Sequence, residues 1–338
     1  MSPPLVAYLR PEHRTPVLDG LLREHCRTFV PSAPDPATVA REAAGAVALV
    51  ASSTGIGEPV GAALLDALPS LAVLVSRGSG ADCFDVAAAT ERGIPVLHNV
   101  GVAADAVVEY VLGVLPLLRR GLLARAAALR EGRPDDRAPR PQLAGSTLGI
   151  VGFGAIGASV ARRAEAAYRT RALVHHPRRT AAELWAAGVE PAASLPDLLA
   201  RADAVVVAVP LTAETRGLLG AEALRHMRSD AVLVNVSRGG VVDEAALAAA
   251  LRVGRLAGAA LDVFAEEPPT AATELVGLPT VFATPHCAGT SADARRRLDE
   301  GTAAGVLAAL AGRRPPRIAN GVWPPARPLP VPVEEVVG

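Results

Sequence analysis

The sequence of 338 residues contains no lysine, and all of its 34 basic residues are arginine. Without lysine, the chain cannot form the Schiff base of pyridoxal-phosphate enzymes or provide the lysine of a phosphate-binding P-loop, so both enzyme classes are excluded. The 34 basic residues are balanced by 34 acidic ones, which gives a formal net charge of zero. No overall field would attract nucleic acid or an anionic membrane, so neither is expected as a partner.

Cysteine is also scarce. Cys26, Cys83 and Cys287 lie far apart and form neither a CxxC pair nor an even set, so no disulfide framework is expected. The opening residues, MSPPLVAYLRPEHR, lack the basic and apolar regions of a secretory signal. No apolar run has the length needed to cross a bilayer. These absences predict a cytoplasmic protein without a membrane segment.

Strand-like and helix-like segments alternate almost from end to end, which is the pattern of an α/β protein with parallel sheets. The chain is long enough for two domains with separate hydrophobic cores. Two series of strands are predicted, at residues 5–9, 46–52, 71–76 and 94–99 in the first series, and at 147–152, 171–176, 203–210, 231–237, 258–264 and 280–286 in the second.

The segments that join and follow these series also have distinct patterns. A long apolar helix is predicted from Val102 to Arg130, with a kink at Pro116. Residues 131–142 are polar and rich in proline, which indicates a surface linker. A further helix follows the second series, and the proline-rich tail from about Arg313 is predicted to be extended or disordered.

A glycine pattern marks a dinucleotide site. The segment TLGIVGFGAIGASVARRAEA places Gly152, Gly154 and Gly157 between a predicted buried strand and a predicted helix, with Ala155 and Ile156 between the last two. Glycines at this spacing allow a tight turn, a close approach to a pyrophosphate, and packing of the helix on the strand. The N-terminus of the helix then faces the phosphates.

The end of the next strand suggests which dinucleotide binds. Dinucleotide folds usually place an acidic residue there, on the ribose hydroxyl. Here the sequence is VHHPRRT, so His176 takes that place and Arg178 and Arg179 follow. Guanidinium groups can pair with a 2′-phosphate, which favours NADP(H) over NAD(H); alternatively, the arginines form a solvated turn. No metal site is expected at His175 and His176, because adjacent strand residues point to opposite faces.

Three strands of the second series end in charged or ionisable residues. Arg238 follows a strand in VNVSRGGVVDE, Asp262, Glu266 and Glu267 lie in LDVFAEEPP, and His286 lies in TPHCAGT. The C-terminal ends of parallel strands meet at the crevice where ligands bind. An arginine there suits a carboxylate or ketone oxygen, a histidine can deliver a proton, and a glutamate can keep the imidazole protonated. The alternative is a helix-capping arginine and a core histidine.

With these motifs in order after GFGAIG and VPLTAETRGLLG, the chain resembles the D-isomer-specific 2-hydroxyacid dehydrogenase family over roughly residues 45–312. The resemblance implies that Arg238, Glu267 and His286 are the catalytic residues, with Glu267 rather than Glu266 because it directly precedes proline. It also implies a fold of two doubly wound parallel-sheet domains, in which a Rossmann-type cofactor domain is inserted in a flavodoxin-like substrate domain.

The same resemblance sets domain boundaries and an assembly. It implies a discontinuous substrate-binding domain at residues 1–100 and 290–338, and an NAD(P)-binding domain at residues 101–289, with the active site in the cleft. Proteins of this family usually dimerise through the cofactor domain, so the helix predicted at 102–130 is a candidate contact.

The implied reaction is the reversible reduction of a small anionic 2-oxo acid to the D-2-hydroxy acid. The nicotinamide carries the hydride, His286 delivers the proton, and Arg238 binds the substrate. Asp262 is expected to contact the nicotinamide carboxamide. Further cofactor contacts are expected at Pro210, Thr215, Val236, Ser237 and Gly289.

The loop SRGSGADCFD is expected to bind the substrate carboxylate. Ser79 and Gly80 match the positions at which the family offers backbone N–H groups, and glycine keeps the backbone accessible. Arg77 beside them either recognises a second anionic group on the substrate or faces solvent. The sequence leaves both possibilities open.

Three positions depart from the family pattern. Val100 stands where proline is common, Ala103 where asparagine is frequent, and Tyr110 where histidine is common. These residues border the hinge and cleft, so they affect the substrate assignment more than the fold. Two other functions remain open, namely oxidation of phosphite or formate on the same scaffold, and a non-catalytic dinucleotide-sensing corepressor. The complete set of three catalytic residues argues against the corepressor.

Overall fold

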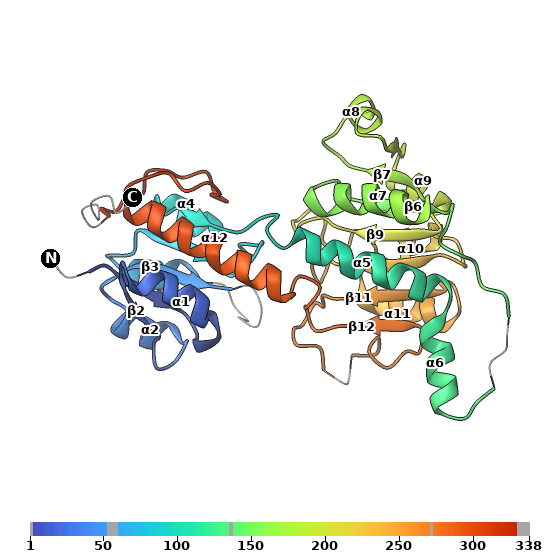
Figure 1. The fold of residues 1–338 in the computed structure, drawn as a ribbon, viewed down its shortest axis with the longest axis horizontal. Coiled ribbons are helices and arrows are strands. Elements are labelled where there is room, and N and C mark those ends of the chain that lie inside the picture. Colours follow the sequence, from blue (N-terminus) through green and yellow to red (C-terminus); the bar gives the residue numbers. More distant parts are fainter. Residues whose placement is uncertain (1–2, 53–59, 135–137, 271–272, 330–338) are drawn as a thin grey trace. The chain divides into compact units, whose positions relative to one another are not determined.

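The structure is a computed structural model that describes residues 3–52, 60–134, 138–270 and 273–329. The chain forms two compact units (Figure 1). The terminal unit comprises Met1–Ala103 and Ser291–Gly338, and the central unit comprises Ala104–Thr290. The boundaries expected from the sequence, at 100/101 and 289/290, lie within a few residues of these.

The terminal unit contains a five-stranded parallel sheet in the order β2-β1-β3-β4-β5, which is the flavodoxin-like order. Its strands are β1 (Leu5–Tyr8), β2 (Arg27–Phe29), β3 (Ala46–Ala51), β4 (Val73–Ser76) and β5 (Val96–Leu97). Side chains alternate between the two faces, so that Val6 and Tyr8 join one hydrophobic cluster and Ala7 joins the other. The sequence did not predict β2, which has three residues and is partly exposed.

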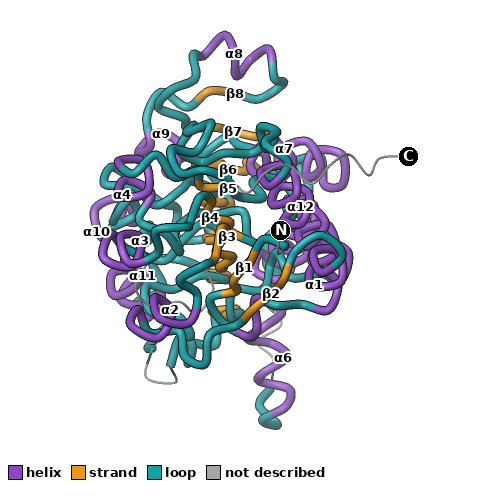
Figure 2. The backbone as a smooth tube through the Cα atoms, turned by 90° about the vertical axis from the view of Figure 1, so that its left-hand side faces the viewer, coloured by secondary structure: helices purple, strands orange, loops and turns teal. Residues whose placement is uncertain are grey.

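Helices cover both faces of this sheet, as Figure 2 shows for the strands in orange between the helices in purple. The short 3-10 helix η1 (Pro11–His13) follows β1. One face carries α1 (Pro16–Arg23) and α12 (Ala292–Leu310), and the other carries α2 (Pro36–Glu42), α3 (Ala62–Ala67) and α4 (Val86–Glu91). Burial on both faces explains why the strands read as continuous apolar runs.

The tail was expected to be extended or disordered, and over residues 313–329 it contains no helix and makes specific contacts with the terminal unit, which fits the extended alternative. The N–H of Ala319 donates to the carbonyl of Val96 at 2.7 Å, so the tail pairs with the edge strand β5. The guanidinium of Arg327 donates to the carbonyl of Leu68 at 2.6 Å and to neighbouring carbonyls at the end of α3. The last carbonyl groups of a helix lack N–H donors within the helix, so the guanidinium of Arg327 satisfies them.

The central unit contains a seven-stranded parallel sheet in the order β12-β11-β10-β9-β6-β7-β8. Its strands are β6 (Thr147–Val151), β7 (Arg171–His175), β8 (Glu190–Pro191), β9 (Ala204–Val207), β10 (Val232–Asn235), β11 (Gly258–Leu261) and β12 (Val281–Ala283). The order of the strands reverses between β6 and β9. This doubly wound, Rossmann-type arrangement puts the ligand crevice of such sheets at the C-terminal ends of those two strands.

Two hydrophobic clusters cover the two faces of the central sheet. Helices α5 (Ala104–Arg119) and α7 (Ala155–Tyr168) contribute to the first, and α9 (Leu195–Arg201), α10 (Ala221–His226) and α11 (Glu244–Arg252) to the second. The remaining helices are α6 (Leu122–Arg130) and α8 (Ala181–Ala186). Within the described ranges, no helix has both the length and the apolar character that a membrane crossing requires.

The helix predicted at 102–130 is in fact two helices, α5 and α6. The break falls at Gly121, whose φ of 58° is left-handed, whereas Pro116 lies inside α5. A proline cannot donate to the carbonyl four residues earlier, which belongs to Leu112. The hydroxyl of Tyr168 donates to that carbonyl at 3.1 Å, so α5 continues through the proline with its acceptor satisfied.

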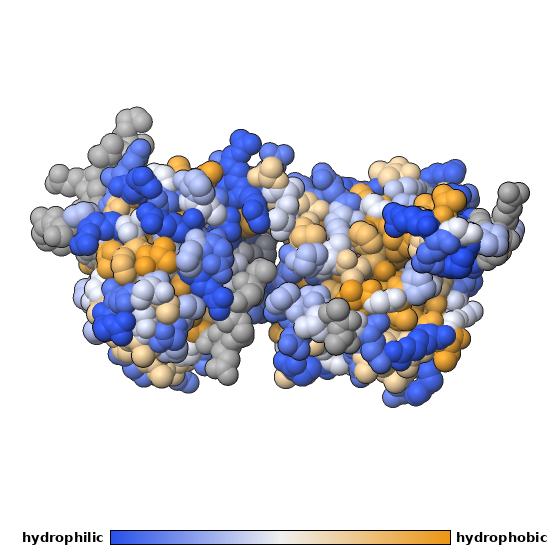
Figure 3. All heavy atoms as spheres, turned by 90° about the horizontal axis from the view of Figure 1, so that it is seen from below, coloured by the Kyte–Doolittle hydropathy of each residue, from blue (hydrophilic) through white to orange (hydrophobic). Residues whose placement is uncertain are grey.

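Apolar side chains gather on the face of the central unit seen at the right of Figure 3. Helix α6 contributes exposed apolar residues, because Leu122 is 39% and Leu129 is 80% exposed. The unit in which a dimer contact is expected therefore exposes apolar side chains.

Candidate active site

The three expected catalytic residues follow three adjacent strands of the central sheet. Arg238 follows β10, Glu267 follows β11 and His286 follows β12. The side chains of Glu267 and His286 are 21% and 25% exposed, so small molecules can reach them while most of their surface is covered. Parallel pairing of these strands brings residues more than forty positions apart to one edge of the sheet.

His286 and Glu267 form a direct pair, with 2.7 Å between Nδ1 and Oε2. Burial raises the pKa of Glu267, but the hydrogen bond and charge of His286, the N–H of Phe264 and the charge of Arg238 together hold this pKa below its ordinary value. Glu267 is therefore ionised near neutral pH. An imidazole whose Nδ1 donates to a carboxylate presents Nε2 as the atom that gives or takes a proton.

The backbone of His286 is unusual. Its φ is 51°, in the left-handed region that residues other than glycine rarely adopt. The N–H of His286 donates to the carbonyl of Asp262 at 2.8 Å and to that of Thr284 at 3.0 Å. Such a conformation persists only when neighbouring contacts impose it, and it is common where a side chain must be aimed for function.

A compact turn presents Arg238. The amide of Asn235 accepts from the N–H and hydroxyl of Ser237 at 3.0 and 2.7 Å, and it donates to the carbonyl of Arg238 at 3.2 Å. A Cβ at Gly239 would overlap the carbonyl of Phe264, so the turn packs directly on the chain after β11. The glycine after Arg238 therefore allows the turn and the loop of Glu267 to lie against each other.

Asp262 anchors the loop that carries His286. Its Oδ1 accepts from the hydroxyl of Thr284 at 2.6 Å and from the N–H of Cys287 at 2.8 Å, and its Oδ2 accepts from the N–H of Ala288 at 2.9 Å. The residue is 2% exposed. These bonds make Asp262 a support of the loop, and the expected contact with a nicotinamide carboxamide stays a prediction.

The glycine loop after β6 fits the phosphates of a dinucleotide. Ala155, Ile156 and Gly157 form the first turn of α7, and Gly154 is its N-cap. A Cβ at Gly157 would overlap the carbonyl of Gly152, so the helix packs closely on the turn. A Cβ at Gly154 would meet nothing within 4 Å, which leaves open space in front of the N-terminus of the helix.

The end of β7 carries basic groups next to this loop. The N–H of Arg178 donates to Nδ1 of His176 at 3.2 Å, which puts the ring hydrogen of the neutral imidazole on Nε2. Burial and the charges of Arg179 and Arg178 lower the pKa of His176, so the ring is neutral near pH 7. The guanidinium of Arg179 lies 5.6 Å from the ring centre of Phe153 within the glycine loop.

The other expected cofactor residues occupy loops at the same edge of the central sheet. The hydroxyl of Thr215 donates to the carbonyl of Pro210 at 2.7 Å, which folds the loop after β9. Val236 and Ser237 are buried directly after β10, and Gly289 follows β12. The direct contacts of these residues with a cofactor stay predictions.

The expected substrate loop belongs to the terminal unit, directly after β4. There the guanidinium of Arg77 pairs with Asp299, with 2.6 Å between Nε and Oδ1, and the two side chains are only 14% and 4% exposed. Of the two expectations for Arg77, the one that it faces solvent is therefore wrong. The hydroxyl of Ser79 donates to the carbonyl of Asn99 at 3.2 Å, and the carbonyl of Gly80 accepts from Ser76.

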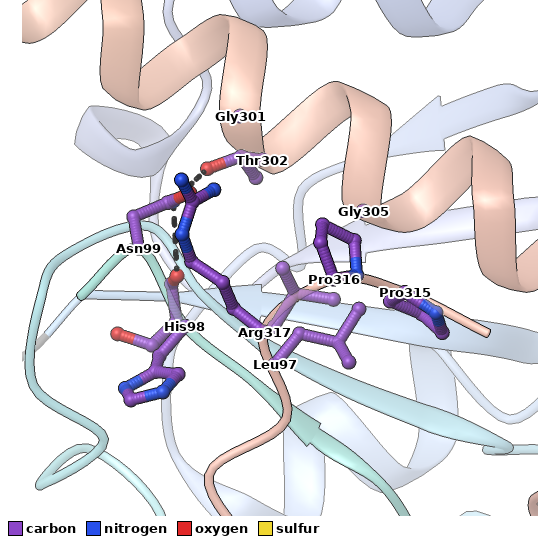
Figure 4. A pocket seen from close by; sticks show the side chains of 11 residues that line it. Leu97, His98, Asn99, Gly301, Thr302, Gly305, Pro315, Pro316 and Arg317 are labelled. Atoms are coloured by element: carbon purple, nitrogen blue, oxygen red, sulfur yellow. Dashed lines mark hydrogen bonds between the residues drawn. The ribbon is translucent and has the colours of Figure 1, made fainter. Parts of the chain in front are cut away.

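Asn99 fixes this loop to helix α12. Its Nδ2 donates to the hydroxyl of Thr302 at 2.8 Å and to the carbonyl of Arg77 at 3.1 Å, and Figure 4 shows Asn99 and Thr302 pointing toward each other. The adjacent cavity, bordered also by His98 and Arg317, has a volume of about 10 Å³, which is room for one water molecule. This cavity cannot hold an acid substrate.

Sequence reasoning missed Asn99, Asn235 and Thr284, although each is a polar residue next to a strand end. For Asn235 and Thr284, a polar residue between apolar neighbours was a signal that could have found them. Among the residues with described positions, no group of three or more His, Cys, Asp or Glu side chains could hold a metal ion.

Comparison with known proteins identifies the central unit. The model of the family described as "D-isomer specific 2-hydroxyacid dehydrogenase, NAD binding domain" matches residues 112–288. A glyoxylate reductase of Thermofilum pendens is 37% identical over 278 residues, which cover 80% of this chain and 81% of the relative. An (S)-sulfolactate dehydrogenase of Chromohalobacter salexigens is 41% identical over 251 residues, which cover 74% and 81%.

Solved structures agree with the fold of the whole chain. The NADPH-dependent glyoxylate/hydroxypyruvate reductase of Sinorhizobium meliloti, in complex with NADP and malonate, matches with a TM-score of 0.81 at 30% identity. The match covers 95% of this chain and 98% of that chain.

Proposed function

Because the chain belongs to the D-isomer specific 2-hydroxyacid dehydrogenase family, we propose that it reduces a small 2-oxo acid to the D-2-hydroxy acid and catalyses the reverse reaction. The observation that carries this proposal is the contact of 2.7 Å between His286 and Glu267, which follow the adjacent strands β12 and β11, beside the turn after β10 that presents Arg238. An acid–base group, its carboxylate partner and a cation for the substrate are the groups this reaction needs.

When bound, the nicotinamide of the cofactor supplies the hydride. Arg238 binds the carboxylate and carbonyl oxygens of the 2-oxo acid and orients the carbonyl carbon. His286 gives its Nε2 proton to the alkoxide that develops on reduction, and takes the hydroxyl proton in the reverse direction. Glu267 stabilises the imidazolium. General acid–base assistance of this kind contributes roughly 10²–10⁴-fold to the rate.

The proposed substrates are glyoxylate and hydroxypyruvate, which have one anionic group. Relatives named glyoxylate reductase and glycerate dehydrogenase support this class. The ion pair of Arg77 with Asp299 also supports this class, because a guanidinium that is already paired with a carboxylate binds a second anion less strongly. The backbone N–H groups at Ser79 and Gly80 are proposed to bind the substrate carboxylate.

The proposed cofactor is NADP(H). The end of β7 carries a neutral His176 and the cations of Arg178 and Arg179, so no carboxylate repels a 2′-phosphate there. The solved complex of the related reductase with NADP supports the same choice.

Initial rates with NADPH and NADH against a panel of acids test this function. The panel contains glyoxylate, hydroxypyruvate, phosphohydroxypyruvate and sulfopyruvate, with oxidation of phosphite and formate measured separately. We expect the highest kcat/KM with NADPH and one of the first two acids. Preference for phosphohydroxypyruvate or sulfopyruvate would overturn the substrate class, and activity with phosphite or formate alone would overturn the reaction.

Cofactor choice is tested by replacing Arg178 and Arg179 together with alanine. We expect KM for NADPH to rise about tenfold or more while KM for NADH changes little, because bidentate phosphate pairing contributes on the order of 1.5–3 kcal/mol. Arg171→Ala at the opposite end of β7 is the matched control and leaves both values unchanged. Equal effects on both cofactors would contradict the assignment.

The proposed partner is a second copy of the chain, bound through the central unit. Helix α6 leaves Leu129 80% exposed, and such apolar residues favour a contact. Analytical ultracentrifugation should give a dimer that Leu122→Ser with Leu129→Ser weakens. A wild-type monomer at micromolar concentration would exclude this assembly.

A further inference from the structure

Tyr110 is one of the three departures from the family pattern, and the proposed reaction gives it no role. It lies on α5, and its hydroxyl is 2.8 Å from Oγ1 of Thr284. Thr284 in turn donates to Asp262 at 2.6 Å. Asp262 holds the loop around His286 through the N–H groups of Cys287 and Ala288. A continuous chain of hydrogen bonds thus runs from α5 to the loop of the acid–base residue.

The direction of every bond in this chain follows from the chemistry of its members. A carboxylate only accepts, so the single hydroxyl hydrogen of Thr284 points to Asp262. Thr284 must then accept from Tyr110, whose phenol donates. Burial raises the pKa of Tyr110, and the charge of Asp262 adds to this, so the phenol keeps its proton. Each hydroxyl therefore has a defined direction, and removing one of them takes one hydrogen bond from its neighbour.

We propose that Tyr110 and Thr284 are positioning residues that hold the loop of residues 284–288 and thereby aim the imidazole of His286. The loop needs such support because His286 has a φ of 51°, which its neighbours must impose. The consequence for turnover rests on the proposed function, whereas the consequence for the order of the loop does not.

A purely packing role for Tyr110 is the competing explanation. Its ring lies 6.2 Å from that of Phe282, at an interplanar angle of 31°. Tyr110→Phe keeps this ring contact and removes only the hydroxyl. Thr284→Val likewise keeps the shape and removes the hydroxyl. Tyr168→Phe is a matched control, because it also removes one phenol hydrogen bond to a residue of α5, away from the loop of His286.

The first experiment measures kinetics with NADPH and the best 2-oxo acid of the panel. We expect Tyr110→Phe to lower kcat about 3- to 10-fold, with KM for NADPH unchanged, and Tyr168→Phe to keep wild-type kcat. Because Tyr110 acts through Thr284, the double variant should be no slower than Thr284→Val alone. Wild-type kcat in Tyr110→Phe, or additive effects in the double variant, would overturn the proposal.

The second experiment needs no turnover. Cys287 is exposed, whereas Cys26 and Cys83 are buried, so the rate at which a disulfide reagent labels the native protein reports on Cys287. Burial and the charge of Asp262 raise the pKa of the Cys287 thiol, so a loosened loop should react faster. We expect labelling several-fold faster in Tyr110→Phe and unchanged in Tyr168→Phe, with Cys287→Ser identifying the signal.

The two experiments separate the two proposals. Faster labelling of Tyr110→Phe in a protein that reduces no acid would retain the positioning role and reject the proposed function. Equal labelling of wild type and Tyr110→Phe in an active enzyme would reject the positioning role and retain the function.

Discussion

The two units have the same architecture, but the buried polar groups around His286 in the central unit have hydrogen-bond partners, whereas two buried polar side chains of the terminal unit have none in the part of the chain that the structure describes. Both have a parallel sheet with helices on its two faces. In the central unit, the carboxylate of Asp262 accepts three hydrogen bonds and His286 pairs with Glu267. In the terminal unit, the hydroxyl of Tyr8 and both ring nitrogens of His13 are buried, with no hydrogen-bond partner among the described residues.

These two kinds of buried polar group affect different properties of the protein, namely side-chain direction and folding stability. Partnered polar groups fix the direction of a side chain, whereas buried polar groups without a partner cost free energy of folding, about 1–3 kcal/mol each. Substitutions at the strand ends of the central unit should therefore change turnover more than stability. Substitutions in the terminal unit, away from its expected substrate loop, should change stability more than turnover.

The largest effect is expected for His286→Gln. The variant keeps a polar side chain but cannot deliver the proton, so kcat should fall roughly 10²- to 10⁴-fold. Steady-state rates give this value, and fluorescence titration with NADPH should give an unchanged Kd. Thermal unfolding checks that the fold is retained.

Glu267→Gln is the companion variant. It keeps the shape of the side chain but removes the charge that is proposed to stabilise the imidazolium, so its kcat should fall less than that of His286→Gln. Wild-type turnover in His286→Gln would remove the acid–base role. A large loss of stability in both variants would contradict the distinction between the units.

The sequence predicted the sheets well, because their strands are apolar runs bounded by turns. Leu5–Tyr8 and Ala46–Ala51 lie within the predicted ranges, whereas the strand predicted at 203–210 ends at Val207. Strands β2 and β8 were missed, since a few half-exposed residues leave no apolar pattern. Strand ends are harder still, because tertiary packing decides where pairing stops.

The candidate site was predictable to the extent that sheet topology determines it. The convergence of Glu267 and His286 follows from the order of β11 and β12. The bonds of Asp262 were not predictable, because their donors include backbone N–H groups whose directions depend on the positive φ of His286. Nor was the pair of Arg77 with Asp299, since 222 positions separate the two residues.

A smaller effect, on stability, is expected from His13 in the terminal unit. Burial lowers the pKa of His13 to about 4 from 6.5. Between these values the unfolded chain binds a proton that the folded chain does not. The stabilisation is therefore complete above pH 6.5, falls as the pH drops toward 4, and amounts to about 3 kcal/mol in total.

Urea unfolding at pH 7 and pH 4.5 measures this dependence. His13→Leu should be more stable than wild type at both values, and should lose less stability between them. His226→Leu on the exposed surface of α10 is the control and should keep the wild-type dependence. If His13→Leu had the same pH dependence as wild type, the acid sensitivity would have to come from other groups.

The smallest effect is expected for Arg327→Met, which keeps most of the side-chain stem but loses the bonds to the carbonyls at the end of α3. Several charge-assisted bonds are lost, yet water can reach a freed helix end, so the cost should be about 1–2 kcal/mol. Limited proteolysis should cut the tail sooner, while kcat stays unchanged. Arg296→Met on α12 is the control, because its side chain is 64% exposed and its ion pair contributes little. A fall in kcat without faster cleavage would mean that the tail acts on catalysis, and the division of roles between the two units would then fail.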